Sequence, residues 1–291
     1  MADDPDLDRL RAEIDDIDDV IHDHLVHRAE VVGTLTSAKK TPPGGSGMRP
    51  QREAALMGRR LRRHTGSLPH AVIFRIWREI VAASLRLQGP LSVAICAPEN
   101  SVGYWDLARN HFGSATPMTL HRSAGVVLRW MSSQAGAFAM LPVPPADDEN
   151  PWWPQLVDMP HDGPHIVMRL PYFKDRTNRA EQLSALVIGP APFVESGADV
   201  SLLVVTAQAQ ISRPRLVDAL KSVGIAGHCT ATLDEADGES GCYLHLVEVD
   251  GFVTRGDARL SALVRMPAVM RVSALGGYPV PIDSTNLAVA T

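Results

Sequence analysis

The stretch LDRLRAEIDDIDDVIHDHLVHRAEVVGTLTSAKK, from Leu7 to Lys40, decides the fold of the N-terminal part of the chain. Its apolar residues recur mostly at intervals of three and four, which predicts one long amphipathic helix. These residues are Leu7, Leu10, Ile14, Ile17, Ile21, Leu25, Val32 and Leu35. At the rise of an α-helix the segment is roughly 45 Å long, too long to be covered by a compact single domain. We therefore expect its apolar side to pack on another subunit or on a long neighbouring helix.

Three cations on this acidic helix, Arg11, Arg28 and Lys39, form the first candidate site. Arg28 and Lys39 are about three helical turns apart and point the same way, whereas Arg11 is turned by roughly 100° from Arg28. One helix cannot aim all three at one ligand, but a second, antiparallel copy would bring in its own Arg11. Taken singly, each has an ordinary explanation. Arg11 can pair with Asp8 or Asp15 at the surface, and a lysine is favoured at a helix C-terminus.

Two shorter helices are predicted next. TPPGGSG (Thr41 to Gly47) breaks the first helix with proline and glycine. The second helix runs roughly from Pro50 to His64, with proline in its first turn. The third runs from about Pro69 to Leu87 and is stopped by QGP, residues 88–90.

The spacing of four segments resembles that of the all-helical chorismate mutases. The segments are LDRLRAEIDDID, VHRAEVVGTLTSAKK, QREAAL and IWREIVAASLRLQ, and the similarity covers about residues 7 to 88. The resemblance implies an intertwined homodimer of three-helix subunits, in which the first-helix arginine comes from the partner. It also implies the conversion of chorismate to prephenate in phenylalanine and tyrosine biosynthesis. This concerted [3,3] rearrangement needs no nucleophile, general base, cofactor or metal.

The resemblance also implies a role for each polar residue of the three helices. Arg28 and the partner's Arg11 bind the two carboxylates of chorismate, and Lys39 and Gln88 face its ether oxygen. The remaining implied substrate-binding residues are Arg52 and Ser84, which support a carboxylate, and Glu53, which takes the hydroxyl. Such groups would hold the compact conformer and meet the charge that develops on the ether oxygen.

The chain changes character after Gly89. Short apolar strands are expected at LSVAICAP, AGAFAMLPVPP and HIVMRLPYF, with a helical segment near Tyr104 to Phe112 and a loop over residues 145–165. From Leu183 onward the order becomes strand, helix, strand, strand, helix, strand. That order is typical of an antiparallel sheet with helices covering one face.

Residues 91–291 resemble a reduced form of the region C-terminal to the mutase in bifunctional chorismate mutase–prephenate dehydratases. The dehydratases place a Thr-Arg-Phe triplet where this chain reads Leu183-Ser184-Ala185, so we expect no dehydratase activity. The predicted fold is multi-domain. It has an all-α chorismate mutase domain (residues 1–89), a truncated dehydratase-like α/β domain (90–197) and an ACT-like, ferredoxin-like α+β domain (198–291).

Composition limits the other partners. The chain has 291 residues and a formal net charge of −5, which argues against nucleic acid or an anionic membrane as the main partner. The start lacks the features of a signal peptide, and the three cysteines have no metal-ligand spacing, so a cytoplasmic location is expected. His22, His24 and His27 do not share one side of a helix, and we expect no metal site there.

Three alternatives stay open at this point. The chain can be a working bifunctional mutase–dehydratase, or an isochorismate pyruvate lyase of the same helical fold. From a different class, it can be a non-catalytic sensor that binds a ligand of aromatic metabolism in the mutase pocket.

Overall fold

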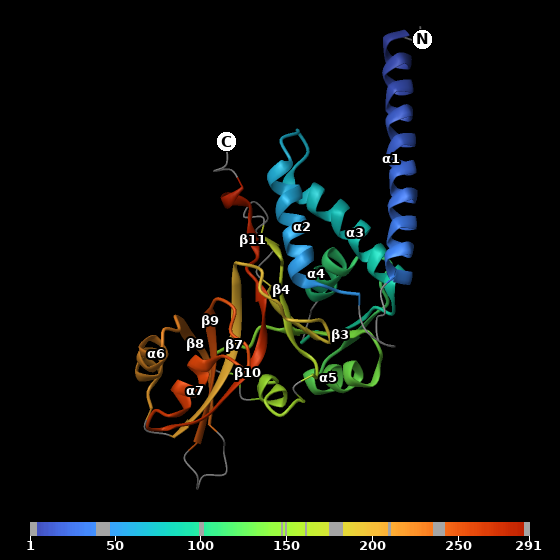
Figure 1. Cartoon of the computed structure of the whole chain (residues 1–291). Coiled ribbons are helices and arrows are strands. Elements are labelled where there is room, and N and C mark those ends of the chain that lie inside the picture. The colour runs from blue at the N-terminus through green and yellow to red at the C-terminus, as the bar shows by residue number, and fades with distance from the viewer. Residues whose placement is uncertain are drawn as a thin grey trace.

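The computed structural model describes residues 5–38, 47–98, 102–146, 148, 150–160, 162–174, 183–208, 211–234 and 242–287. The three predicted helices come first: α1 (Pro5–Ala38), α2 (Pro50–Arg63) and α3 (His70–Gln88). A large mixed sheet with further helices on its faces comes after them (Figure 1). Within the described ranges, no helix combines the length and the apolar character that a membrane crossing requires.

The sheet has nine strands in the order β2-β1-β3-β6-β4-β10-β7-β9-β8. In chain order these are β1 (Ser92–Cys96), β2 (Met118–His121), β3 (Ala137–Pro142), β4 (His165–Leu170), β6 (Ala185–Gly189), β7 (Asp199–Gln208), β8 (Gly227–Asp234), β9 (Cys242–Asp250) and β10 (Val269–Pro279). Two short strands, β5 (Phe173–Lys174) and β11 (Ile282–Asp283), pair separately.

The C-terminal part has the predicted order, with helices α6 (Arg213–Ser222) and α7 (Ala258–Val264) between its strands. Its strands β10, β7, β9 and β8 are antiparallel neighbours. Leu216 and Leu263 of the two helices share a core with Leu203 of β7, so both helices cover the same face of the sheet.

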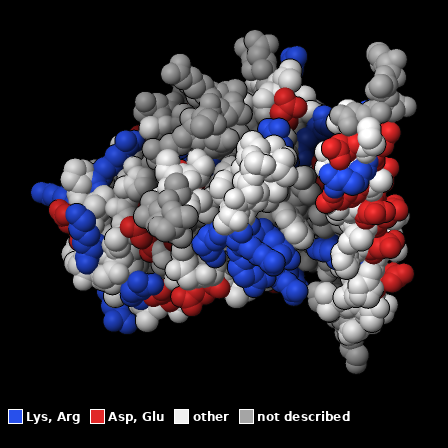
Figure 2. Space-filling view, turned by 90° about the horizontal axis from the view of Figure 1, so that it is seen from above, with Lys and Arg blue, Asp and Glu red and all other residues white. Residues whose placement is uncertain are grey.

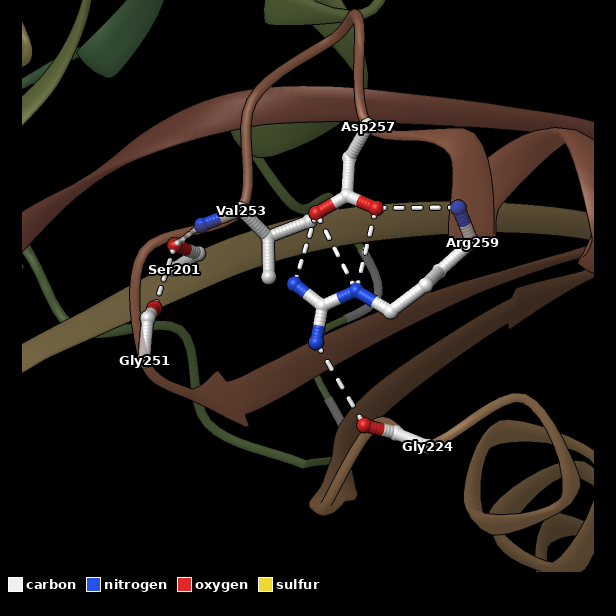
Figure 3. Close-up of polar contacts among 6 residues, drawn as sticks. All are labelled: Ser201, Gly224, Gly251, Val253, Asp257 and Arg259. Atoms are coloured by element: carbon white, nitrogen blue, oxygen red, sulfur yellow. Dashed lines mark hydrogen bonds and ion pairs between the residues drawn. The ribbon is translucent and has the colours of Figure 1, made fainter.

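Polar contacts fix the loop between β9 and α7 (Figure 3). Ser201 Oγ donates to the Gly251 carbonyl at 2.8 Å and accepts from the Val253 N–H at 2.9 Å. Asp257 caps α7 by accepting from the Arg259 N–H at 2.9 Å. Its pKa is lowered by the hydrogen bonds from the Arg259 guanidinium. These contacts satisfy the loop's own polar groups and account for its shape.

The sheet continues across the predicted boundary at residue 197. β10 runs parallel to β4, where Gly276 is paired with Ile166. Arg169 of β4 also contacts both carboxylate oxygens of Glu248 at 3.2 Å and the Tyr278 hydroxyl at 3.0 Å. The two parts of the sheet therefore share hydrogen bonds, and the domain limits themselves stay a prediction.

Two elements in the first part of the sheet were not predicted. Strand β2 has only four residues at the sheet edge, none of them buried, so its sequence carries no apolar pattern. Helix α5 (Ala124–Ser133) has only ten residues, and its sequence begins Ala-Gly. Helix α4 spans Val102–Phe112, close to the predicted segment. Trp152 and Trp153, in the stretch predicted as a loop, are buried in a hydrophobic cluster with residues of α5, and the second begins a short 3-10 helix, η1 (Trp153–Leu156).

Successive side chains of strand β1 pack in two different hydrophobic clusters, one on each face of the sheet. Val93 and Ile95 of β1 pack in one cluster with residues of α2, α3 and α4, such as Met57 and Phe74. Ala94, by contrast, lies in the cluster on the other face, with α5 and the two tryptophans. Helices α2 and α3 therefore share a hydrophobic core with the sheet.

Helix α1 is placed differently. Among its residues 5–38 none is buried, and only Arg28, Val32 and Thr36 are half-buried. These three residues are spaced by four and therefore lie on one face of the helix. Near its C-terminal end, α1 packs against α3 through this face. Figure 1 shows its N-terminal part projecting beside the rest of the molecule.

Candidate active site

A cavity of ≈ 200 Å³ lies between the C-terminal part of α1, the first turns of α2 and the last turns of α3. Five of the seven predicted site residues line it. They are Arg28, Arg52, Glu53, Ser84 and Gln88, and the apolar part of the wall includes Val32, Leu35, Leu56, Val81 and Leu85. The fold thus brings together side chains that are up to sixty residues apart in the sequence.

Arg28 is held against the wall of this cavity by α3. Its guanidinium donates a hydrogen bond to Ser84 Oγ, which in turn donates to the Ile80 carbonyl at 2.7 Å. Burial, and then the nearby charge of Arg60, lower the pKa of Arg28. An arginine nevertheless stays protonated at neutral pH, so a fixed positive charge lies at this point of the wall.

Gln88 closes the end of the cavity at the last residue of α3. Its Nε2 donates to the Ser84 carbonyl at 3.1 Å, which places the amide in the same wall as Ser84. Gly47 approaches it closely, because a Cβ at that glycine would lie 2.9 Å from Gln88 Cβ. A larger residue at position 47 would push Gln88 away from its place.

Glu53 is buried and already has a cationic partner. Its Oε2 accepts from Arg78 Nη1 at 2.8 Å, and its Oε1 faces the Arg49 N–H at 3.4 Å. Only one of its oxygens therefore remains for a ligand in the cavity. Arg78 was not among the site residues predicted from the sequence.

The charge of the wall is strongly positive. Arg49, Arg52 and Arg59 are exposed at the cavity and add to Arg28, while Glu53, the only acid among the described residues that line it, is already paired. Figure 2 shows basic side chains gathered at the centre of the face seen from above. Such a wall suits a small anionic molecule.

Arg59 lines the cavity but was not predicted. It lies seven residues after Arg52, two turns along the same face of α2, which is a signal that helical spacing could have revealed.

Two predicted residues are not among the described residues that line the cavity. Arg11 pairs with Asp8 at 3.1 Å and is exposed. It lies seventeen residues before Arg28 on the same helix, roughly 25 Å along its axis. Lys39 lies outside the described residues, directly after the end of α1.

The family comparison covers all three helices of this cavity. The model of the family "Chorismate mutase type II" matches residues 10–89. Residues 10–89 are a chorismate mutase type II domain. The match begins one residue before Arg11 and ends one residue after Gln88, so all the predicted site residues fall within this domain.

The chain is also homologous to larger enzymes. The bifunctional chorismate mutase/prephenate dehydratase of Pseudomonas aeruginosa is 31% identical over 148 residues, which are 49% of this chain and 40% of that protein. The match thus spans less than half the length of this curated relative.

Solved structures are similar to a larger share of the chain at low identity. A quorum-quenching acylase has a TM-score of 0.46 and 16% identity, and covers 65% of this chain and 94% of its own. A prephenate dehydratase from Streptococcus mutans has a TM-score of 0.45 and 15% identity, and covers 66% of this chain and 99% of its own.

Proposed function

We propose that this protein is a chorismate mutase that converts chorismate to prephenate for phenylalanine and tyrosine biosynthesis. The observation that carries the proposal is the cavity of the mutase domain, where Arg28, Ser84 and Gln88 meet Arg52 and Glu53. Chorismate carries two carboxylates and rearranges within one molecule. Cations that hold its compact conformer, and donors that meet charge on its ether oxygen, are therefore sufficient machinery.

Each residue then has one task. Arg28, oriented by Ser84, binds one carboxylate, and Arg52 supports its charge. Gln88 donates to the ether oxygen, together with Lys39, as the C–O bond breaks. Glu53 offers its Oε1 to the substrate hydroxyl.

The site is completed by a second copy of the chain. The apolar side of α1 is exposed from residue 7 to residue 25, through Leu7, Leu10, Ile14, Ile17, Ile21 and Leu25. Spacings of three and four over these residues favour packing between long helices. Because Arg11 of the same chain is too far from the cavity, the Arg11 that binds the second carboxylate comes from the partner. The protein therefore acts as a homodimer.

The C-terminal half is proposed to consist of a dehydratase-like domain (90–197) and an ACT-like domain (198–291). The name of the curated relative makes dehydratase activity the second candidate function. The positions directly before β6 argue against it, because Leu183 and Ser184 stand where the dehydratases have a threonine and an arginine. We therefore propose that this half does not dehydrate prephenate.

A single assay tests these proposals. The purified full chain is incubated with chorismate, and the product is identified with and without phenylalanine or tyrosine. Prephenate supports the mutase, phenylpyruvate reveals a dehydratase, and unchanged chorismate overturns the proposal and favours a sensor. A parallel incubation with isochorismate, read out as salicylate, tests for lyase activity.

A further inference from the structure

Arg78 of α3 forms a buried ion pair directly behind the wall of the cavity. Its side chain is 1% exposed, and its Nη1 lies 2.8 Å from Glu53 Oε2. Arg78 does not line the cavity itself. It can therefore act on a ligand only through Glu53.

The same guanidinium has a second anchor in the sheet half of the molecule. Its Nε donates to the main-chain carbonyl of His111, near the end of α4, at 2.7 Å. The neighbouring Phe112 packs in the core that α2 and α3 share with the sheet, beside Phe138 of β3. Arg78 thus ties the first turns of α2 to an element beyond the mutase domain.

This arrangement fixes the rotamer of Glu53. Arg78 takes Oε2 from behind, so Oε1 is the oxygen that stays at the front, beside the Arg49 N–H. A carboxylate as buried as Glu53 is costly to keep charged without a partner, which makes the position of the cation decisive. Lysine cannot replace the two anchors, because its ammonium lacks the planar fork that meets both acceptors.

We propose that Arg78 is a positioning residue of the mutase site, which holds Glu53 with one oxygen toward the substrate and is itself anchored on α4. The inference rests on the proposed mutase function and on the role of Glu53 in taking the substrate hydroxyl. It gives the sheet half a part in the reaction, since residues outside 10–89 hold a group of the cavity in place.

The test uses the full-length chain and chorismate as the substrate. Arg78→Met is expected to lower kcat/KM about 100-fold, the typical cost of a displaced positioning group. The loss should lie more in KM than in kcat, because the hydroxyl takes no part in the bonds that break and form. Arg75→Met is the matched control, since Arg75 is exposed one turn earlier on α3 and should leave both constants unchanged.

A double-mutant cycle with Glu53→Gln separates positioning from general damage. If Arg78 acts through Glu53, the double variant should be no worse in kcat/KM than Glu53→Gln alone. Additive losses, or an Arg78→Met enzyme as active as wild type, would overturn the inference. If the thermal unfolding curve shows that Arg78→Met does not fold, the cycle is run with Arg78→Lys. An inactive wild type would overturn the proposed function, and this inference with it.

Discussion

Two helices of the same mutase domain, α1 and α3, have opposite surroundings. Among residues 5–38 of α1 none is buried, although the helix carries a continuous apolar side. In α3, by contrast, six residues are buried against the rest of the chain: Phe74, Arg78, Val81, Ala82, Ser84 and Leu85. Both helices contribute side chains to the same cavity.

The difference teaches that the cavity has two kinds of support. Its α3 wall is held by the chain's own sheet, through a shared core and through Arg78. Its α1 wall has only a narrow contact around Arg28 and Val32, and its apolar side is exposed where we propose that a second copy packs. A substitution in the α1 wall should therefore disrupt assembly, whereas a substitution in the α3 wall should reduce the local order of the cavity.

The largest effect is expected from Ile17→Asp, in the middle of the apolar side of α1. A charge there opposes burial of the helix against a partner, so the dimer should dissociate and the mutase rate should fall more than about 100-fold. Sedimentation velocity and the chorismate assay measure the two effects. Val26→Asp is the control, because Val26 is also exposed and lies about half a turn around the helix from Ile17.

If Ile17→Asp changes the assembly and Val26→Asp does not, the α1 wall depends on a second copy and the α3 wall does not. An Ile17→Asp protein that is monomeric and fully active would contradict this dependence, since the cavity would then be complete within one chain.

The second effect concerns Arg28, where α1 meets α3. Arg28→Ala removes a charge-assisted contact to the substrate worth about 1.5–3 kcal/mol, so kcat/KM should fall about 10- to 150-fold. Steady-state kinetics measure it, on a variant whose sedimentation matches that of the wild type. Arg9→Ala on the same helix removes an exposed arginine that pairs only at the surface with Asp6, and should change kcat/KM little. An equal loss in both variants would mean that α1 matters for assembly alone.

Some elements of the fold could be predicted from the sequence, and others could not. The apolar spacing of residues 7–40 predicted one long helix, and α1 (Pro5–Ala38) is close to those limits because the intervals of three and four continue over most of its length. The C-terminal strands were readable because β7, β9 and β10 are long and apolar. Short edge elements such as β2 carry too little pattern to be recognised.

The candidate site was predictable only in part. The resemblance to the helical chorismate mutases singled out Arg28, Ser84 and Gln88, and all three line the cavity. Arg78 could not be singled out, because Arg75 and Arg78 look alike in the sequence FRIWRE and only tertiary packing buries the second. Its partner carbonyl at His111 is thirty-three residues away, in another part of the fold.

The third prediction concerns Gln88, on the wall held by the sheet. A glutamine amide donates at any pH, so the wild-type mutase rate should change little between pH 6 and 8. Gln88→Glu should make the rate fall with rising pH, since a carboxyl can donate only while it is protonated, by up to about tenfold per pH unit. The measurement is kcat/KM from pH 5 to 9. A wild-type rate that itself falls steeply above pH 6 would contradict the role given to Gln88.

The smallest effect is expected from replacing the side chain of His111, which leaves in place the main-chain carbonyl that anchors Arg78. Burial, and then the charge of Arg78, hold the pKa of His111 well below its usual range. In the unfolded chain, the His111 side chain takes up a proton below about pH 6.5, whereas the buried side chain stays neutral until its lowered pKa is reached. The contribution of His111 to folding stability is therefore fully present above about pH 6.5 and is lost as the pH falls toward the lowered pKa.

His111→Leu should remove this loss, which for one proton is at most about 1.4 kcal/mol per pH unit. Neither ring nitrogen has a hydrogen-bond partner among the described residues, so leucine forfeits no bond, and the carbonyl that Arg78 needs remains. Thermal unfolding between pH 5 and 8 should therefore give a flatter profile for His111→Leu, with the mutase rate at pH 8 unchanged. Leu107→Ala, also on α4, should lower Tm at every pH and keep the wild-type slope. A lowered mutase rate in His111→Leu would mean that the α4 anchor needs the imidazole itself, and that the sheet supports the cavity through more than one main-chain bond.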